Sequence, residues 1–246
     1  MNTQIFIQAR MGSTRLPGKV LKKICGKTII ELTVERLKNV KEVSKIVLVT
    51  SVNKENNVLV EEAKKIGVDY FRGSEENILD RFYQASKEFK PDTIIRVTAD
   101  CPLIDPDIIS KGLELFKTGR YDIVSNVVPR TYPHGYDFEI FSVQAMVRSW
   151  RDQRAKFKNE KVFDKTVINP TNYLFKNKNF RHGNIKNDLD LHKIRLTLDY
   201  KEDFEVIKII YENLYKKSGP FNMDTLLDFI DNNSHILEIS KDHKIF

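Results

Sequence analysis

Apolar runs that alternate with amphipathic segments are the feature that most limits how this chain can fold. Most runs have the length of one buried strand, and the segment that follows repeats apolar residues at helical spacing. Strands that alternate with helices in this way form a mostly parallel sheet with helices on both faces. The sequence therefore predicts a Rossmann-like α/β fold. The expected strands are residues 4–9, 45–52, 68–71, 92–100, 121–127 and a later strand that ends at Asp199.

The length and composition fit one domain of this kind. The 246 residues are 41% hydrophobic and 30% charged, which is typical of a globular chain with a sizeable core. Residues from about 140 to 190 differ, because they are rich in lysine and asparagine and only weakly periodic. We expect a single domain over residues 1–246 with an inserted arm at about 140–190. The arm is either a surface excursion or a segment that packs on a second subunit.

Charge and cysteine content narrow the expected partners. The net charge of +7 favours anionic substrates such as nucleotides, although a solvated lysine-rich surface gives the same total. The lysines are spread along the chain rather than clustered, so we expect no nucleic-acid partner. No apolar run approaches the roughly 18 residues that cross a bilayer, so we expect no membrane association. Cys25 and Cys101 lack metal-site spacing, and two free thiols suit the cytoplasm.

The turn after the first expected strand, residues 7–21, concentrates groups that bind phosphate. Gly12 and Gly18 allow backbone N–H groups to approach an anion closely, and Ser13 adds a hydroxyl donor. The three cations of this turn are Arg10, Arg15 and Lys19. Such closely spaced cations repel one another unless an anion joins them. A phosphate-binding loop is therefore predicted, and a turn with solvated cations is the structural alternative.

Two known phosphate-loop patterns do not fit this turn. Gly12 and Gly18 are one residue too far apart for a P-loop, and Val20 stands where the P-loop has a hydroxyl residue. The G-x-G-x-x-G pattern of dinucleotide sites is also absent. The loop therefore matches neither known pattern, although the groups that bind phosphate remain in it.

The stretch QARMGSTRLPGK within this loop resembles the N-terminal signature of the cytidylyltransferases that make CMP-activated acidic sugars. It is most similar to the SpsF-like branch, which acts in spore-coat polysaccharide biosynthesis. Residues 71–85, 96–106 and 195–207 are similar to further blocks of that family, in the same order. The resemblance implies a fold of the nucleotide-diphospho-sugar transferase type. It also implies Mg²⁺ as cofactor, CTP as co-substrate and a homodimer formed through the arm.

Asp100 and Asp199 each end an expected strand, so both carboxylates reach one edge of the sheet if the two strands belong to it. Mg²⁺ prefers a few carboxylates together with phosphate oxygens and water. Either aspartate could instead cap a helix, and Asp199 stands just before an acidic helix start. The resemblance matches both positions to the metal-binding aspartates of the family. We therefore predict that Asp100 and Asp199 hold Mg²⁺ and that Asp100 is catalytic.

The resemblance also implies the nucleotide pocket. Arg15 and Lys19 are predicted to be catalytic, because they would neutralise charge on the leaving pyrophosphate. The block at residues 71–85 is implied to lie over the base with Arg81 as a contact, although Ser74 also fits a helix N-cap. The predicted nucleotide-binding residues are Gln8, Ala9, Arg10, Gly12, Ser13, Arg15, Lys19, Ser74, Arg81, Thr98 and Asp100.

Four residues are predicted to bind the acceptor. A guanidinium inside a sheet is costly unless it is paired, so Arg96 either pairs in the core or points to the site, and we predict the site. The segment at residues 132–142 resembles the family segment beside the acceptor sugar, although a lone histidine is commonly a packing residue. The predicted substrate-binding residues are Arg96, His134, Asp137 and Glu139.

Together these features predict that the chain transfers CMP from CTP to an acidic sugar, of the nonulosonic or KDO type, and releases pyrophosphate. Two alternatives stay open. One is a nucleotidyltransferase that uses another nucleoside triphosphate or acts on a phosphonate, a polyol phosphate or another sugar. The other is a nucleotide-binding protein without catalytic activity.

Overall fold

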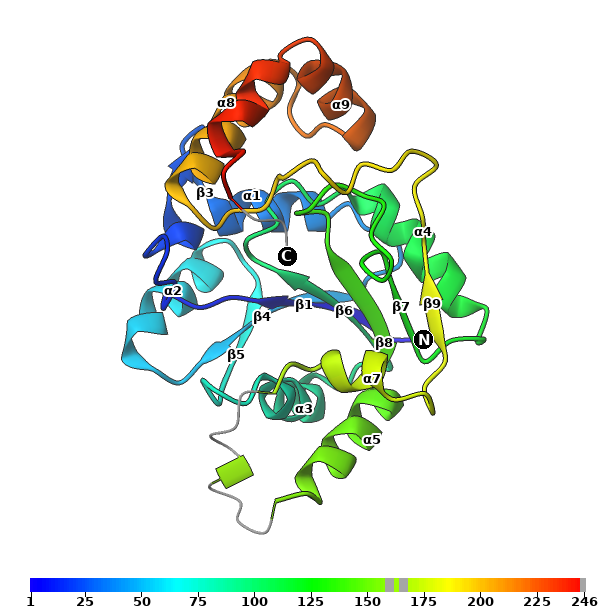
Figure 1. Ribbon diagram of the computed structural model, residues 1–246. Coiled ribbons are helices and arrows are strands. Elements are labelled where there is room, and N and C mark those ends of the chain that lie inside the picture. Colours follow the sequence, from blue (N-terminus) through cyan, green and yellow to red (C-terminus); the bar gives the residue numbers. More distant parts are fainter. Residues whose placement is uncertain (158–161, 164–167, 244–246) are drawn as a thin grey trace.

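The apolar runs of the sequence form the central strands of one sheet. The structure, a computed structural model, describes residues 1–157, 162–163 and 168–243. Within them the large sheet has seven strands in the order β5-β4-β1-β6-β8-β7-β9 (Figure 1). The strands are β1 (Thr3–Gln8), β4 (Lys45–Ser51), β5 (Asp69–Gly73), β6 (Thr93–Thr98), β7 (Ile123–Ser125), β8 (Phe138–Ser142) and β9 (His182–Asn184). Only β8 runs antiparallel to its described neighbours, so the predicted mostly parallel α/β fold is confirmed.

Helices cover both faces of this sheet (Figure 1). One face carries α1 (Ile29–Leu37), α4 (Pro106–Lys117) and α8 (Lys201–Ser218), and the other carries α3 (Ile78–Phe89), α5 (Val143–Arg154) and α7 (Asn172–Lys176). The remaining elements are β2 (Lys23–Ile24), β3 (Lys27–Thr28), α2 (Asn57–Lys65), α9 (Met223–Asp231) and the 3-10 helices η1 (Lys19–Leu21), η2 (Lys54–Asn56) and η3 (Ser234–Ser240).

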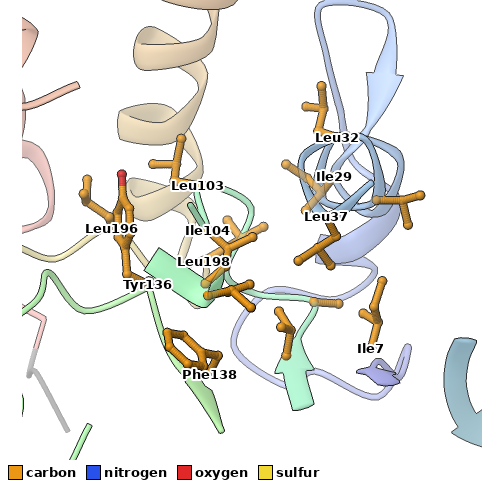
Figure 2. Packing of buried hydrophobic residues seen from close by; sticks show 14 of the residues in the cluster. Ile7, Ile29, Leu32, Leu37, Leu103, Ile104, Tyr136, Phe138, Leu196 and Leu198 are labelled. Atoms are coloured by element: carbon orange, nitrogen blue, oxygen red, sulfur yellow. The ribbon is translucent and has the colours of Figure 1, made fainter. Parts of the chain in front are cut away.

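The side-chain alternation of β1 divides the apolar core into two layers. Ile5 and Ile7 are fully buried in the cluster under α1 and α4, part of which is drawn in Figure 2. Phe6 points to the opposite face, where its ring centroid lies 5.7 Å from that of Phe82 on α3. A strand buried on both faces has to be apolar throughout, which is why residues 5–7 carry no polar side chain.

Polar residues at the strand-to-helix junctions start the helices. The side chain of Thr28 accepts from the backbone N of Glu31 at the start of α1, and Ser142 accepts from Ala145 at the start of α5. Asp105 caps α4 directly before Pro106, whose fixed φ suits the first helical position. Asp105 starts α4 in the segment that follows β6, close to the edge where the functional residues gather, whereas Ser142 lies beside Thr93 at the opposite edge of the sheet.

Part of the predicted arm can be followed in the structure. Residues 140–190 contribute α5, α7 and the edge strand β9, and the ring of Trp150 on α5 stacks on Tyr83 of α3 with centroids 4.1 Å apart. Residues 158–161 and 164–167, which also belong to the predicted arm, lie outside the described residues. The single domain and the dimer-forming role of the arm therefore stay predictions. In the part of the chain that the structure covers, no helix has the length and apolar character needed to cross a membrane.

The strand expected to end at Asp199 is a correction to the sequence prediction. Residues 195–199 are extended, but the structure gives them only one isolated bridge, between His134 and Arg195. Leu196 and Leu198 are buried in the core, and the backbone N of Leu198 donates to the carbonyl of Asp100 at 2.8 Å (Figure 2). Asp199 therefore reaches the edge of the sheet as the end of an anchored extended segment and not as the end of a sheet strand.

Candidate active site

A cavity of about 450 Å³ opens at the carboxyl ends of β1 and β6, the edge at which open α/β sheets bind ligands. Ten of the eleven predicted nucleotide-binding residues line it, together with Asp199. Ser74 lines a neighbouring cavity instead. The wall also contains Thr14, a hydroxyl residue of the predicted phosphate-binding loop. The lining residues that the sequence prediction missed are Val20, Glu75, Glu76, Ile78 and Ala99.

The loop after β1 is held in place by its own backbone and by a neighbouring helix. The backbone N of Met11 donates to Asn56 Oδ1 at 2.8 Å, and the backbone N of Lys19 donates to the carbonyl of Leu16 at 3.2 Å. Gly18 precedes η1 with a φ of +66°, a left-handed conformation that favours glycine. The turn at Gly18 directs the next side chain, that of Lys19, into the cavity.

Lys19 joins the two aspartates that the sequence singled out. Its Nζ lies 3.0 Å from Asp100 Oδ2 and 3.0 Å from Asp199 Oδ1, and it also donates to the carbonyl of Leu198 at 2.7 Å. Burial lowers the pKa of Lys19, but the two carboxylates outweigh it and raise the pKa above its ordinary value. Burial by itself would raise the pKa of Asp100, but the Lys19 ammonium outweighs burial and brings this pKa below its usual range. Lys19 and Asp100 are therefore both charged at neutral pH.

The other two loop cations are more exposed. Arg15 Nη2 donates to Asp199 Oδ1 at 2.8 Å, and its guanidinium lies over the ring of Tyr200 at 5.1 Å from the centroid. Arg10 Nη1 donates to Glu75 Oε1 at 3.0 Å. The side chain of Arg15 retains 42% of its accessible area and that of Arg10 retains 58%, so both can also contact an anion in the cavity.

Asp100 and Asp199 are too few to bind a divalent cation by themselves, so a bound substrate has to supply further coordinating oxygens. Across the described ranges, no group of three or more His, Cys, Asp or Glu side chains is arranged to hold a metal ion. The two carboxylates nevertheless each place an oxygen 3.0 Å from a single cationic atom, Lys19 Nζ. Mg²⁺ commonly binds one or two carboxylates and takes its other ligands from substrate phosphates and water. The pair therefore fits Mg²⁺ that arrives with a nucleoside triphosphate.

A buried network fixes Asp199. Asp203 Oδ2 accepts from the backbone N of Asp199 at 2.8 Å and from that of Tyr200 at 2.9 Å, at the start of α8. Arg195 donates to both oxygens of Asp203 at 2.8 Å. Asp203 thus has the helix-end role expected of an acidic first turn. Arg195 was not singled out from the sequence, because its partner lies eight residues away across a turn.

Arg81 supports the loop that forms one wall of the cavity. It is buried, and it donates to the carbonyls of Ser74 at 2.7 Å and Glu75 at 2.8 Å. Burial lowers its pKa to about 10. Ser74 is not the N-cap of α3, since Asn77 caps that helix and the Ser74 hydroxyl accepts from the backbone N of Asn77 at 3.0 Å.

None of the four predicted acceptor residues lines the cavity. Arg96 Nη1 lies 2.8 Å from both oxygens of Glu139 on the neighbouring strand β8. Asp137 pairs with Arg130. His134 is half-buried, and its Nδ1 has no hydrogen-bond partner among the described residues. Their role toward a substrate stays a prediction.

Gly135 brings this segment close to residues 195–199. Its φ is +113°, and a Cβ would lie 2.5 Å from the carbonyl carbon of Leu196. We expect Gly135→Ala to lower the free energy of unfolding by about 2–4 kcal/mol, measured by urea denaturation. Gly119→Ala is the matched control, because φ is +72° there and a Cβ meets open space. An equal loss in both variants would show that the approach to Leu196 does not matter.

Comparisons with known proteins agree with this geometry. A family model described as cytidylyltransferase matches residues 4–226. The chain is 36% identical over 240 residues to an uncharacterized protein of Methanocaldococcus jannaschii, covering 96% of this chain and 93% of that protein. It is 31% identical over 224 residues to the spore coat polysaccharide biosynthesis protein SpsF of Bacillus subtilis, and the match covers 86% of this chain and 88% of that protein.

A solved cytidylyltransferase from Leptospira borgpetersenii has the same architecture. It superposes with a TM-score of 0.85 at 32% identity, and the match covers 100% of this chain and 99% of that one. The resemblance stated from the sequence motifs is therefore confirmed. This chain belongs to the cytidylyltransferase family of nucleotidyltransferases.

Proposed function

We propose that this protein transfers CMP from CTP to a hydroxyl group of an acidic sugar and releases pyrophosphate. The observation that carries the proposal is the contact of Lys19 with Asp100 and Asp199, each at 3.0 Å, in a cavity that also contains Arg10 and Arg15. Such a site offers cations for a triphosphate and carboxylates for its counterion. The likeness to SpsF supports a product used in polysaccharide biosynthesis.

In this reaction the protein mainly positions the reactants and neutralises charge, and it forms no covalent bond to them. The acceptor hydroxyl oxygen forms a bond to the α-phosphorus and gives up its proton to water, the bond from that phosphorus to the β-phosphate bridging oxygen breaks, and pyrophosphate leaves. The backbone of the loop after β1 and the side chains of Arg10 and Arg15 would bind the triphosphate. Lys19 would exchange an aspartate partner for a phosphate oxygen as negative charge builds on the leaving group.

Asp100 and Asp199 would hold Mg²⁺ together with phosphate oxygens. When bound, the ion supplies positive charge at the phosphate that is attacked. As Lys19 turns from an aspartate to the phosphates and Arg15, which also donates to Asp199, contacts the triphosphate, carboxylate oxygens would become available for this role. Asp203 and Arg195 would keep the Asp199 backbone fixed during that exchange.

The class of acceptor is inferred from the family resemblance and from charge. Arg15 keeps part of its guanidinium exposed in the cavity, where it can meet a carboxylate of a nonulosonic or KDO-type acid as well as a phosphate. A phosphonate or a polyol phosphate has similar charge and is the nearest alternative. A protein that binds the nucleotide without turnover is the alternative from another class.

Pyrophosphate release tests the proposal directly. The assay contains Mg²⁺, each of the four nucleoside triphosphates in turn, and a panel of nonulosonic and KDO-type acids, phosphonates and polyol phosphates. We expect release with CTP and one of the acids. Stabilisation by CTP without release from any acceptor would favour the non-catalytic alternative, and no response to any nucleotide would reject the nucleotide site.

Asp100→Asn is expected to abolish Mg²⁺-dependent turnover. The amide keeps the shape of the side chain but removes the charge that attracts both Mg²⁺ and Lys19. Pyrophosphate release is measured over a range of Mg²⁺ concentrations. Asp107→Asn, at the exposed start of α4, is the matched control. Activity that persists undiminished in Asp100→Asn would remove this residue from the metal site.

We also propose a cytoplasmic homodimer that is formed through residues of about 140–190. The stacking of Trp150 on Tyr83 places α5 of this segment firmly against the nucleotidyltransferase core, where it can support a partner. Sedimentation equilibrium of the whole chain distinguishes a monomer from a dimer.

A further inference from the structure

The amide of Gln8 has a fixed orientation in the cavity wall. Gln8 ends β1, and its Oε1 accepts from Arg96 Nε at 3.0 Å. An arginine side chain only donates hydrogen bonds, so the oxygen of the amide has to face Arg96. The Nε2 group, which carries two N–H donors, is therefore turned away from Arg96. The structure gives Nε2 no acceptor within its described residues, although Gln8 lines the cavity.

Arg96 is itself held rigidly. It pairs with both oxygens of Glu139 at 2.8 Å, and the two side chains retain only 8% and 11% of their accessible area. Thr171 Oγ1 donates to Glu139 Oε1 at 3.2 Å and completes the network. A buried ion pair of this kind is seldom more stabilising than apolar side chains of the same volume. Its presence inside the sheet is better explained by what it positions, and it contacts the cavity residue Gln8.

The wall around Gln8 suits an uncharged ring. The loop cations and the two aspartates give the cavity strongly charged groups, whereas Gln8 is followed in the chain by Ala9 and lies beside Thr98 on the neighbouring strand, and these three residues line the cavity without a charge. Given the proposed function, on which this inference rests, the triphosphate takes the charged part and the base takes the part beside Gln8. Cytosine presents two acceptors, O2 and N3, on its pairing edge. Uracil carries a hydrogen on N3.

We propose that Gln8 selects cytosine by donating from Nε2 to the O2 and N3 edge of the base. Arg96 and Glu139 are positioning residues that keep the amide in the donating orientation. Uracil is disfavoured because its O2 still accepts one hydrogen bond, but its N3–H faces the second Gln8 N–H and leaves that donor without an acceptor. The ion pair inside the sheet thereby contributes to nucleotide specificity without contacting the nucleotide.

Gln8→Glu tests the role of the amide. A glutamate of the same shape still accepts from Arg96 but offers no N–H to the base. We expect the ratio of CTP to UTP affinity, measured by calorimetry, to fall by about 10- to 100-fold, and the ratio of kcat/KM to fall with it. The use of a ratio cancels any general effect of the added charge on triphosphate binding. Gln153→Glu on α5 makes the same chemical change outside this cavity and should leave the ratio unaltered.

The double variant Arg96→Leu with Glu139→Leu tests the positioning role. Removing both charges together avoids an unpaired buried ion and frees the Gln8 amide to rotate. We expect the CTP to UTP ratio to fall while the melting temperature stays close to that of the wild type. A purely structural role would lower stability and reduce the affinity for both nucleotides equally.

The outcomes separate this inference from the proposed function. A wild type that releases pyrophosphate from CTP while Gln8→Glu keeps its CTP to UTP ratio overturns the role of Gln8 alone. A wild type that binds CTP and UTP equally shows that no cytosine selection exists, which also overturns it. A wild type that transfers nothing to any acceptor, but whose preference for binding CTP over UTP is lost in Gln8→Glu, supports the role of Gln8 and rejects only the transferase activity.

Discussion

Lys19→Ala is expected to lower kcat for pyrophosphate release by about 10²–10³-fold, by analogy with the loss of a positioned electrostatic donor. The ammonium is the one group that contacts Asp100 and Asp199 together within the described residues, at 3.0 Å from each. Without it the leaving pyrophosphate loses a charge partner and the two carboxylates repel the triphosphate. Steady-state kinetics at saturating CTP and Mg²⁺ measures the effect.

Two controls make this result specific. Lys23→Ala removes an exposed lysine of β2 from the same part of the chain and should leave kcat unchanged. Circular dichroism of Lys19→Ala checks that the fold survives the loss of the buried cation. A decrease in kcat of less than about threefold would exclude Lys19 from transition-state stabilisation.

Asp203→Ala is expected to have the largest effect on stability, a loss of about 3–5 kcal/mol in the free energy of unfolding. The substitution leaves the buried guanidinium of Arg195 without its two bonds at 2.8 Å and removes the acceptor for the backbone N of Asp199 and Tyr200. At about 2–4 °C per kcal/mol for a chain of this size, the melting temperature should fall by about 6–20 °C. Differential scanning calorimetry measures it.

Asp231→Ala, at the exposed end of α9, is the matched control and should change the melting temperature little. A similar small change for Asp203→Ala would mean that the pair with Arg195 is dispensable. Because Asp203 also holds the backbone of Asp199, the variant should bind Mg²⁺ with CTP more weakly even where it remains folded.

Local patterns were sufficient to predict most of the fold. The apolar run of β1 and the capped helix α1 follow from residues that are close in sequence, and strand-helix alternation leads to a parallel sheet for general reasons of chain connection. The loop after β1 and Asp100 after β6 were predicted to share one edge, and they do, because β1 and β6 are neighbouring parallel strands. The same reasoning was wrong about Asp199, which ends an extended segment outside the sheet.

The partners of charged side chains could not be predicted in this way. We predicted from the sequence that Arg96 points to the site rather than pairs in the core. In the structure it pairs with Glu139, which the antiparallel register of β6 and β8 places opposite it. The antiparallel direction of β8 was not part of the prediction. A register shift of one residue would place Glu139 on the opposite face of the sheet and leave Arg96 unpaired.

The sequence by itself determined the fold class and the family, and it singled out the cation-rich loop after β1 and two aspartates, Asp100 and Asp199, that line one cavity of the structure. Those properties depend on local spacing and on residue types. Only the tertiary structure decided that Lys19 contacts both aspartates, at separations of 81 and 180 residues, and that Gln8 is oriented by Arg96 across 88 residues. Hydrogen bonds and ion pairs act over only a few ångströms, so they form only after the backbone has brought the two segments together. Contacts between residues this far apart in sequence therefore depend on the order and register of the strands.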